Sequence, residues 1–170
     1  MAEKGLRAAT IKPLGGVSAV IRKLLCLVLA LSLCAAAALA GDGTFALRFD
    51  EGFTLSLPEG WVRYPAASDG PIRYALGPGE GGRYLYILVQ DTEMEGIDAL
   101  RAAIEAAGDF GKTSPLELNG ADFAAFIAPA LNASGVATLH DGRLITFLFT
   151  PQDDSDFMLV AAEIMASIQF

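Results

Sequence analysis

The sequence has few of the side chains on which most catalytic and metal sites depend. It contains two cysteines and one histidine, and both cysteines, Cys26 and Cys34, lie within the first forty residues. Residues 41–170 therefore hold no disulfide, no thiolate nucleophile and no cysteine metal ligand. The single histidine, His140, does not suffice for a multi-histidine zinc site and lacks the sequence context of a catalytic triad. We accordingly predict no catalytic residue, no metal site and no cofactor.

Basic residues are also scarce beyond the first forty positions. Five of the twelve Lys and Arg residues lie in residues 1–40, but only one of the twenty Asp and Glu residues does. Residues 41–170 thus have a formal net charge of −12. Nucleic acids and anionic membrane surfaces are both bound mainly through basic side chains. We therefore expect no nucleic-acid partner, and the acidic balance favours solubility.

Apolar residues are abundant near the start of the sequence. An apolar run at 24–40 follows the basic leader and ends in Ala-Leu-Ala at 38–40, directly before Gly41. A basic region, an apolar region and a small-x-small site are together typical of a cleavable secretory signal peptide. We predict that residues 1–40 are this signal, with cleavage after Ala40, and that the protein is periplasmic or secreted in a bacterium. The remaining residues, 41–170, suffice for a single domain with its own core.

Two other interpretations of this leader are open. An uncleaved anchor needs about 20 apolar residues, whereas 24–40 supplies seventeen positions and is followed at once by polar sequence. A bacterial lipoprotein signal has a small residue before its cysteine, but Leu33 precedes Cys34. Cleavage fits better than either, so we expect no stable membrane anchor afterwards. Because the basic stretch is long for a signal peptide, translation from Val17 instead of Met1 is a further hypothesis.

Residues 44–90 predict short strands separated by turn residues. Apolar side chains that alternate with a period of two, bounded by Pro, Gly or Asp, are typical of half-buried strands. Such stretches lie at 44–49, 53–57, 61–64, 72–76 and 83–90. The last stretch is apolar or aromatic on both faces, so we expect it inside the sheet.

The second half of the chain predicts two helices and two hairpins. Apolar residues at helical spacing indicate a helix over 97–107 that ends at Gly108. Strands at 115–118 and 122–128 flank Asn119-Gly120, and strands at 136–140 and 143–150 flank Asp141-Gly142. Both dipeptides are preferred in two-residue type I′ turns.

The last helix is expected from about Asp154 to Ala166. Its apolar stripe consists of Phe157, Val160, Ala161, Ile164 and Ile168. Acidic residues at 153–156 suit the positive N-terminal end of a helix. The order of strands, helix, hairpins and helix predicts an α+β fold with a mainly antiparallel sheet covered by helices.

Two stretches resemble the PsbP-like and DcrB-like proteins. An alternating strand at 53–57 runs into Pro-Glu-Gly-Trp at 58–61, and the end of the chain, 163–170, reads as a helix followed by Ser-x-x-Phe. The resemblance covers nearly all of 44–170 and implies an α/β/α sandwich around an antiparallel sheet of about six strands. It also implies an accessory or protein-binding role, because such relatives are not typically enzymes and share no catalytic motif.

Candidate functional residues are mainly aromatic. Side chains with an aromatic body and a polar tip are common at recognition surfaces. Five aromatic residues would form such a binding surface if they share one face of the sheet: Trp61, Tyr64, Tyr74, Tyr84 and Tyr86. His140 flanks a tight turn, and Ser134 lacks a Gly-x-Ser-x-Gly context. We interpret His140 as a polar residue that flanks the turn and Ser134 as a turn residue.

Acidic residues gather at 91–98 and at 153–156, in each case before an expected helix. Neither cluster has the spacing of a calcium-binding EF-hand loop, so we interpret both as capping and electrostatic support of helix N-termini. Our leading hypothesis is an exported, non-enzymatic domain that binds another envelope or secreted protein. The alternative is a small secreted hydrolase that uses carboxylates of these clusters or a bound metal.

Overall fold

The computed structural model describes residues 43–65 and 70–170, so the expected signal peptide and its cleavage site lie outside the described residues. Within this part of the chain there are nine strands and two α-helices. The strands are β1 (Thr44–Arg48), β2 (Thr54–Pro58), β3 (Trp61–Tyr64), β4 (Ile72–Pro78), β5 (Tyr84–Asp91), β6 (Ser114–Leu118), β7 (Ala121–Ala128), β8 (Ala133–His140) and β9 (Arg143–Thr150). The helices are α2 (Ile97–Ala106) and α3 (Ser155–Ala166), and Pro129–Leu131 forms a short 3-10 turn.

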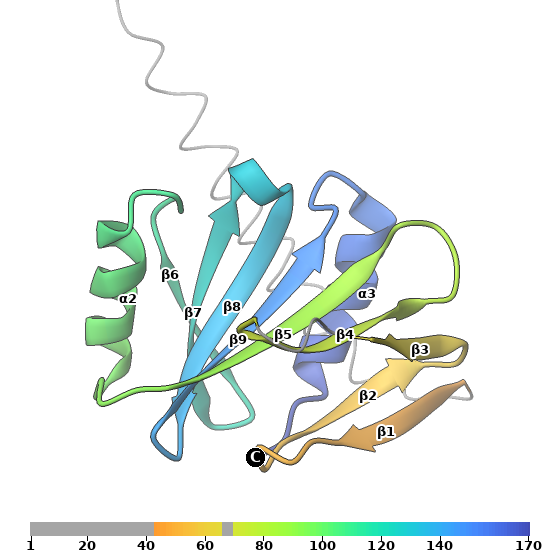
Figure 1. The fold of residues 1–170 in the computed structure, drawn as a ribbon, viewed down its shortest axis with the longest axis horizontal. Coiled ribbons are helices and arrows are strands. Elements are labelled where there is room, and N and C mark those ends of the chain that lie inside the picture. Colours follow the sequence, from red (N-terminus) through yellow and green to blue (C-terminus); the bar gives the residue numbers. More distant parts are fainter. Residues whose placement is uncertain (1–42, 66–69) are drawn as a thin grey trace, which may run out of the picture.

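Seven strands form one antiparallel sheet in the order β3-β4-β5-β9-β8-β7-β6, and β1 pairs with β2 in a separate small sheet (Figure 1). The two helices cover opposite faces of the large sheet. Phe123 packs in the core formed with α3, whereas its strand neighbour Ala124 packs in the cluster formed with α2. The predicted α+β fold with an antiparallel, helix-covered sheet is therefore confirmed, with seven strands in the large sheet where about six were expected.

Both predicted hairpin turns are present. Asn119 and Gly120 connect β6 to β7 with φ angles of 50° and 82°, and Asp141 and Gly142 connect β8 to β9 with φ angles of 47° and 71°. A type I′ turn needs positive φ at both central residues, which explains the choice of Asn or Asp followed by Gly. The strand predicted to lie inside the sheet, β5, is indeed flanked by β4 and β9.

The prediction for Ser134 was wrong. Ser134 is not a turn residue but lies in β8, where it pairs with Ile127 and Phe149. The strand begins earlier than its sequence pattern indicated, because the 3-10 turn and the left-handed Asn132 (φ 46°) complete the chain reversal before Ala133.

The closing helix α3 matches its prediction. Asp154 is the N-cap residue, and its carboxylate accepts a hydrogen bond from the Phe157 backbone N–H at 3.0 Å. Phe157, Ala161 and Ile164 are buried against the large sheet. The strand β2 packs into the same core through Leu55 and Leu57.

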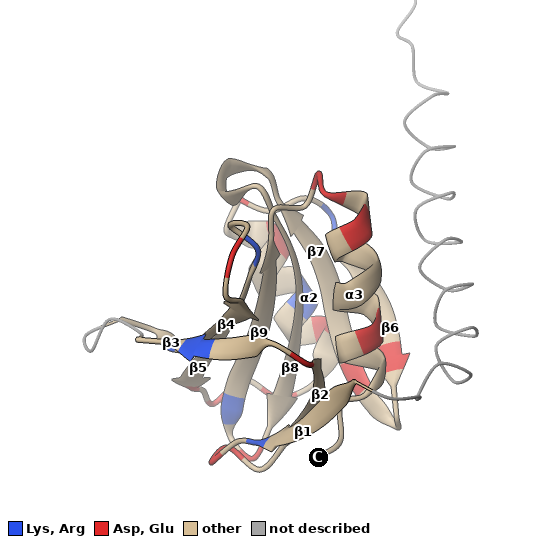
Figure 2. Cartoon of the chain, turned by 90° about the vertical axis from the view of Figure 1, so that its right-hand side faces the viewer, with Lys and Arg blue, Asp and Glu red and all other residues tan. Residues whose placement is uncertain are grey.

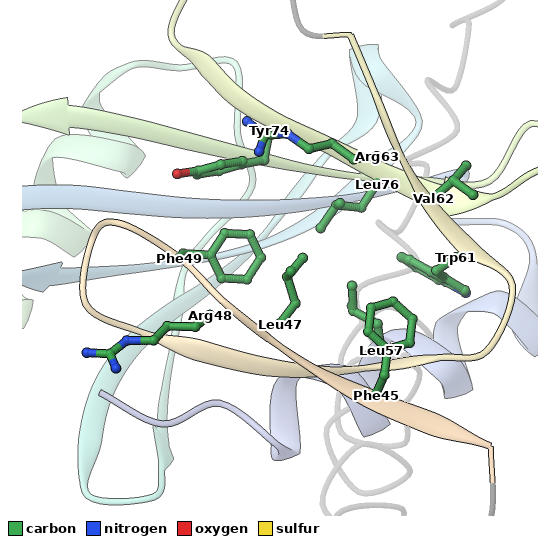
Figure 3. Close-up of a pocket in the computed structure, with 10 residues that line it drawn as sticks. All are labelled: Phe45, Leu47, Arg48, Phe49, Leu57, Trp61, Val62, Arg63, Tyr74 and Leu76. Carbon is green, nitrogen blue, oxygen red and sulfur yellow. The ribbon is translucent and has the colours of Figure 1, made fainter.

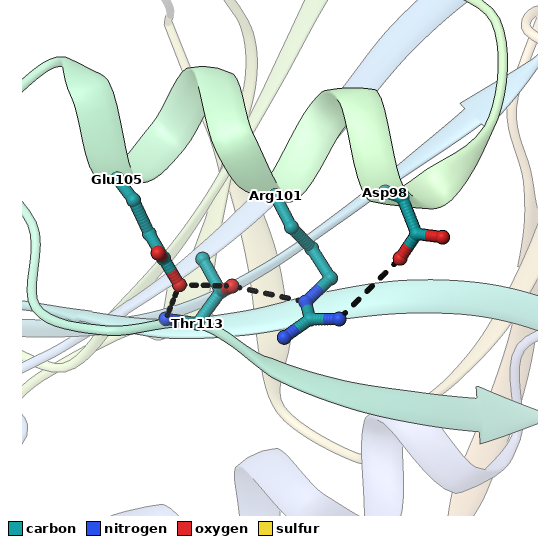
Figure 4. A network of polar contacts seen from close by, with 4 residues as sticks. All are labelled: Asp98, Arg101, Glu105 and Thr113. Atoms are coloured by element: carbon teal, nitrogen blue, oxygen red, sulfur yellow. Dashed lines mark hydrogen bonds and ion pairs between the residues drawn. The ribbon is translucent and has the colours of Figure 1, made fainter.

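The helix α2 is held differently. Its N-cap residue is Gly96, which provides no side-chain cap, so the expectation that the acidic cluster before this helix caps it was wrong. Polar contacts anchor its exposed side instead (Figure 4). Glu105 accepts hydrogen bonds from the Thr113 backbone N–H and hydroxyl at 2.9 and 2.8 Å, and Arg101 donates to the same hydroxyl at 3.0 Å. These hydrogen bonds from Thr113 lower the pKa of Glu105.

Candidate functional site

The five aromatic residues of the predicted binding surface do not share one face of the sheet. Trp61 and Tyr74 belong to the core on the α3 side, where their exposed fractions are 8% and 4%. Tyr64 pairs with Ala75, and Tyr86 also pairs with Ala75, so these tyrosines point to the opposite face from Tyr74. The structure therefore separates the five residues into a pair and a group of three.

The pair, Trp61 and Tyr74, lines a cleft between the β1–β2 hairpin and strands β3 and β4 (Figure 3). The cleft has a volume of about 160 Å³. Eight apolar or aromatic side chains and two arginines line it, and none of the described lining residues is acidic. We refer to it below as the hairpin cleft.

The hairpin cleft has a firm inner wall and an exposed apolar mouth. The ring of Trp61 stacks against Phe157 of α3, with centroids 6.3 Å apart, and the ring of Phe49 packs edge-on against Tyr74 at 4.9 Å. At the mouth, Phe45 is 40% exposed, and Val62, 46% exposed, lies at the rim with its side chain on the opposite face of β3 from Trp61. The floor is thus supported by the core of the domain, whereas the large apolar side chain of Phe45 at the opening faces solvent.

A polar chain of contacts closes one end of the hairpin cleft. The Arg63 guanidinium lies 4.6 Å above the Tyr74 ring, a favourable cation–π arrangement. The Tyr74 hydroxyl donates a hydrogen bond to Glu51 at 2.7 Å, and Arg73 lies 3.4 Å from the other oxygen of that buried carboxylate. Burial, followed by the hydrogen bond to Glu51, raises the pKa of Tyr74, so this residue stays a neutral hydrogen-bond donor at physiological pH.

The group of three, Tyr64, Tyr84 and Tyr86, forms a row on the other face of the sheet. The Tyr64 and Tyr84 rings meet edge-on at 5.5 Å, and Tyr84 stacks on Tyr86 at 5.7 Å. The Tyr64 hydroxyl donates to the Pro78 carbonyl at 3.0 Å. Burial raises the pKa of Tyr86, and the neighbouring Tyr84 adds to this effect. All three side chains are half-buried by one another, and their contacts give this row a packing role.

A second, more polar hollow lies at the other end of the sheet, with a volume of about 420 Å³, and includes His140 and Asp122. The His140 ring packs on Phe170 at 4.4 Å, and its Nε2 atom lies 3.5 Å from Asp141. Two converging carboxylates next to His140 would favour the hydrolase alternative, but Asp122 is the only acidic side chain among the described residues lining the hollow. No group of three or more His, Cys, Asp or Glu side chains placed to hold a metal ion occurs in residues 43–65 and 70–170.

The acidic clusters are used within the fold. Asp154 accepts hydrogen bonds from both the Phe157 backbone and Arg83, whose NH2 atom lies 2.7 Å away. The backbone N–H of Phe157 and then Arg83 lower the pKa of Asp154. In the other cluster, Asp98 lies 3.5 Å from Arg101. The helix-support interpretation is therefore confirmed for Asp154, which caps α3. Near α2 no described side chain of the cluster caps the helix, and Asp98 instead forms an ion pair with Arg101.

Sequence reasoning missed the mouth of the hairpin cleft: Phe45, Val62, Arg48 and Arg63 were not singled out. The alternation of Phe45, Leu47 and Phe49 showed that these residues share one face of a strand. It did not show that this face meets β3 and β4, since that depends on how the hairpin packs.

Among the helices of the described residues, none is long and apolar enough to span a membrane.

Comparison with known proteins supports the fold. The sequence matches no known family model and no curated protein sequence. Among solved structures, the chain is similar to the solution structure of cyanobacterial PsbP (CyanoP) from Synechocystis sp. PCC 6803, with a TM-score of 0.55 and 13% sequence identity. The match covers 77% of this chain and 94% of the cyanobacterial one. The domain therefore has a PsbP-like fold.

Proposed function

We propose that this protein is a non-enzymatic accessory protein that binds another protein at the hairpin cleft. The observation that carries the proposal is the placement of two exposed large hydrophobic residues beside one aromatic-floored cleft: Phe45 at its mouth, and Val62 on the outer face of β3 at its rim. Contiguous apolar surface exposed next to a cleft is typical of interaction sites. Pockets that receive a partner's side chain are also where binding energy concentrates in protein interfaces.

The dimensions of the hairpin cleft favour a side chain over a small-molecule ligand. Small-molecule and cofactor sites usually enclose about 300–1,000 Å³ and cover most of their ligand. At about 160 Å³, the hairpin cleft offers room for one or two apolar side chains. Its floor is built from core residues such as Trp61, so little ordering of the free protein is needed before a partner binds.

The fold and the leader support an exported accessory role. One structural neighbour is a cyanobacterial PsbP, and the stretches 53–61 and 163–170 resemble both PsbP-like and DcrB-like proteins, whose members serve as binding and accessory proteins. The pattern of basic leader, apolar run and Ala-Leu-Ala at 38–40 favours export with cleavage before Gly41. The partner is accordingly proposed to be another envelope or secreted protein.

Site-specific photocrosslinking in the native organism tests the binding role. A photoreactive amino acid is placed at Phe45 or Val62, and at Leu159 as the matched control. Leu159 is also a large, 50% exposed hydrophobic residue, but it lies on α3 outside the cleft. Discrete adducts with another protein are expected at the two cleft positions and not at Leu159. The same adducts at all three positions, or none at any, would refute the proposal.

Export is tested separately. Residues 1–45 are fused to a reporter that is active only outside the cytoplasm, and the N-terminus of the mature protein is sequenced. We expect reporter activity and a mature chain that begins at Gly41. An inactive reporter, or a full-length chain retained in the membrane, would contradict the export part of the proposal without touching the binding site.

A further inference from the structure

We propose that the segment received by the hairpin cleft is an acidic peptide stretch of the partner, with an apolar side chain that enters the cleft and carboxylates that pair with Arg48 and Arg63. This inference rests on the proposed function and specifies the chemistry of its partner. It follows from the charge around the cleft, which differs in sign from that of the domain as a whole.

The positive charge of the domain is concentrated here. Residues 41–170 contain seven basic residues against nineteen acidic ones. Two of these seven, Arg48 and Arg63, line the hairpin cleft. A third, Arg73, pairs with Glu51, the carboxylate that accepts the Tyr74 hydrogen bond. Figure 2 shows acidic residues along α3, whereas basic positions occur among the strands near β1 and β3. Asp50 and Glu51 also lie at this end, but Glu51 pairs with Arg73, so Arg48 and Arg63 supply the attraction for an acidic segment that the rest of the acidic surface repels.

The two arginines that line the cleft are available to a partner. Arg73 already pairs with Glu51, but neither Arg48 nor Arg63 forms an ion pair with any of the described residues. Both side chains are exposed. Arg63 lies over the Tyr74 ring on one wall, whereas Arg48, on the hairpin, points away from the cleft, because it alternates with Leu47 and Phe49 (Figure 3). An extended segment along the hairpin can thus meet Arg63 with a carboxylate on the cleft side and Arg48 with a carboxylate on its other face.

The edge of the small sheet suits an extended segment. β1 pairs with β2 along one edge and with no other strand of the described residues. Its outer edge therefore presents backbone N–H and C=O groups to a peptide strand. Because side chains alternate along a strand, an extended segment places apolar residues toward the cleft and acidic residues beside them.

Peptide binding by the folded domain tests the proposal. The probes are three sets of labelled twelve-residue peptides that share varied apolar centres and differ only in their flanks: Asp and Glu, their neutral isosteres Asn and Gln, or Lys and Arg. We expect binding from the acidic set, at least roughly fivefold weaker binding from the neutral set, and none from the basic set, with affinity falling as salt is raised. Equal or better binding by neutral or basic peptides, or binding by no set, would overturn the inference.

Variants of the protein locate the binding. R48Q and R63Q are each expected to lower the affinity for the best acidic peptide roughly fivefold, which is the contribution of one exposed ion pair. R143Q is the charge control, because the Arg143 side chain is 42% exposed and lies outside the cleft, 3.9 Å from Asp91. It removes the same charge but should leave affinity unchanged. Equal losses in all three variants would show a net-charge effect and overturn the inference.

The two proposals fail in different ways. Crosslinks confined to positions 45 and 62, together with no preference for acidic peptides, would overturn the acidic-segment inference and leave the protein-binding role intact. Absence of those crosslinks would overturn the binding role itself. Circular dichroism and urea melts of every variant ensure that loss of binding is not loss of folding.

Discussion

The helices α3 and α2 are held against opposite faces of the same sheet in different ways. α3 begins with a side-chain cap from Asp154 and buries four residues, whereas α2 begins at an uncapped glycine and buries only Leu100. The small β1–β2 sheet packs beside α3 and shares its core. The α3 face therefore carries most of the hydrophobic core, and the hairpin cleft is built on this well-packed side. Such support pre-organises a site for binding.

The largest effect is expected on the α3 side. Phe157→Ala should lower the free energy of unfolding by about 3–5 kcal/mol, because the ring is buried between Trp61 and Phe149 and its loss leaves a cavity. Urea melts of purified protein measure the change. The control is Glu163→Ala on the exposed side of α3, for which a change of about 0.5 kcal/mol or less is expected. A larger loss from Glu163→Ala would mean that α3 presents its other side to the sheet.

A smaller loss is expected on the α2 side. Leu100→Ala should cost about 2–3 kcal/mol, near the lower end for such substitutions, because half-exposed neighbours such as Ile97 and Ile104 can relax into the space. The same urea melts measure it, with the exposed Ala99→Ser as control. If Leu100→Ala proved more destabilising than Phe157→Ala, the α2 face would be the better packed one, and the comparison would be reversed.

The cap on α3 predicts a pH-dependent difference. The pKa of Asp154 is lowered from its ordinary value of 3.8 by the Phe157 N–H and by Arg83. Such a carboxylate contributes stability above its unfolded pKa and loses it as pH falls through the lower folded pKa. Wild type should therefore be more stable than Asp154→Asn at neutral pH, and the gap should close as the pH drops below about 3.8.

Urea melts from neutral to strongly acidic pH measure this gap. Asp156→Asn serves as control, because the Asp156 side chain makes no hydrogen bond or ion pair with the described residues. A gap between wild type and Asp154→Asn that stays constant across the whole pH range would show that the charge of Asp154 does not support α3.

The smallest effect is expected at the mouth of the hairpin cleft. Val62→Glu should change the free energy of unfolding by about 0.5 kcal/mol or less, because the side chain is already 46% exposed. Thermal and urea melts measure it, with Leu159→Glu on α3 as the equivalent change elsewhere. A loss of several kcal/mol from Val62→Glu would show that the mouth belongs to the core and would remove it as a free docking surface.

Local features of the fold were predictable where the decisive interactions lie close in sequence. Asn119-Gly120 and Asp141-Gly142 specify their turns through the backbone angles of two residues. The stripe of Phe157, Ala161 and Ile164 follows from helical periodicity alone. The start of β8 was misplaced because the 3-10 turn before Ala133 has no comparable signal.

The arrangement of the aromatic residues was predictable only in part. Trp61 and Tyr64 lie three positions apart in one strand and Tyr84 and Tyr86 lie two apart, so alternation alone separates the first pair and unites the second. Relating Tyr74 to Trp61 and Tyr64 requires the register between β3 and β4, and relating it to Tyr84 and Tyr86 requires the register between β4 and β5, which is irregular between Ile72 and Tyr74. No local pattern encodes such a bulge.

By itself, the sequence determined the strands, the tight turns, the closing helix and the shortage of catalytic side chains, since each depends on residue type and short-range spacing. Only the tertiary structure decided the hairpin cleft. Its walls join Phe49 to Tyr74 and Trp61 to Phe157, residues far apart along the chain. Such contacts arise because the β1–β2 hairpin and α3 share the apolar area of one sheet face, and close packing of that shared core fixes their places.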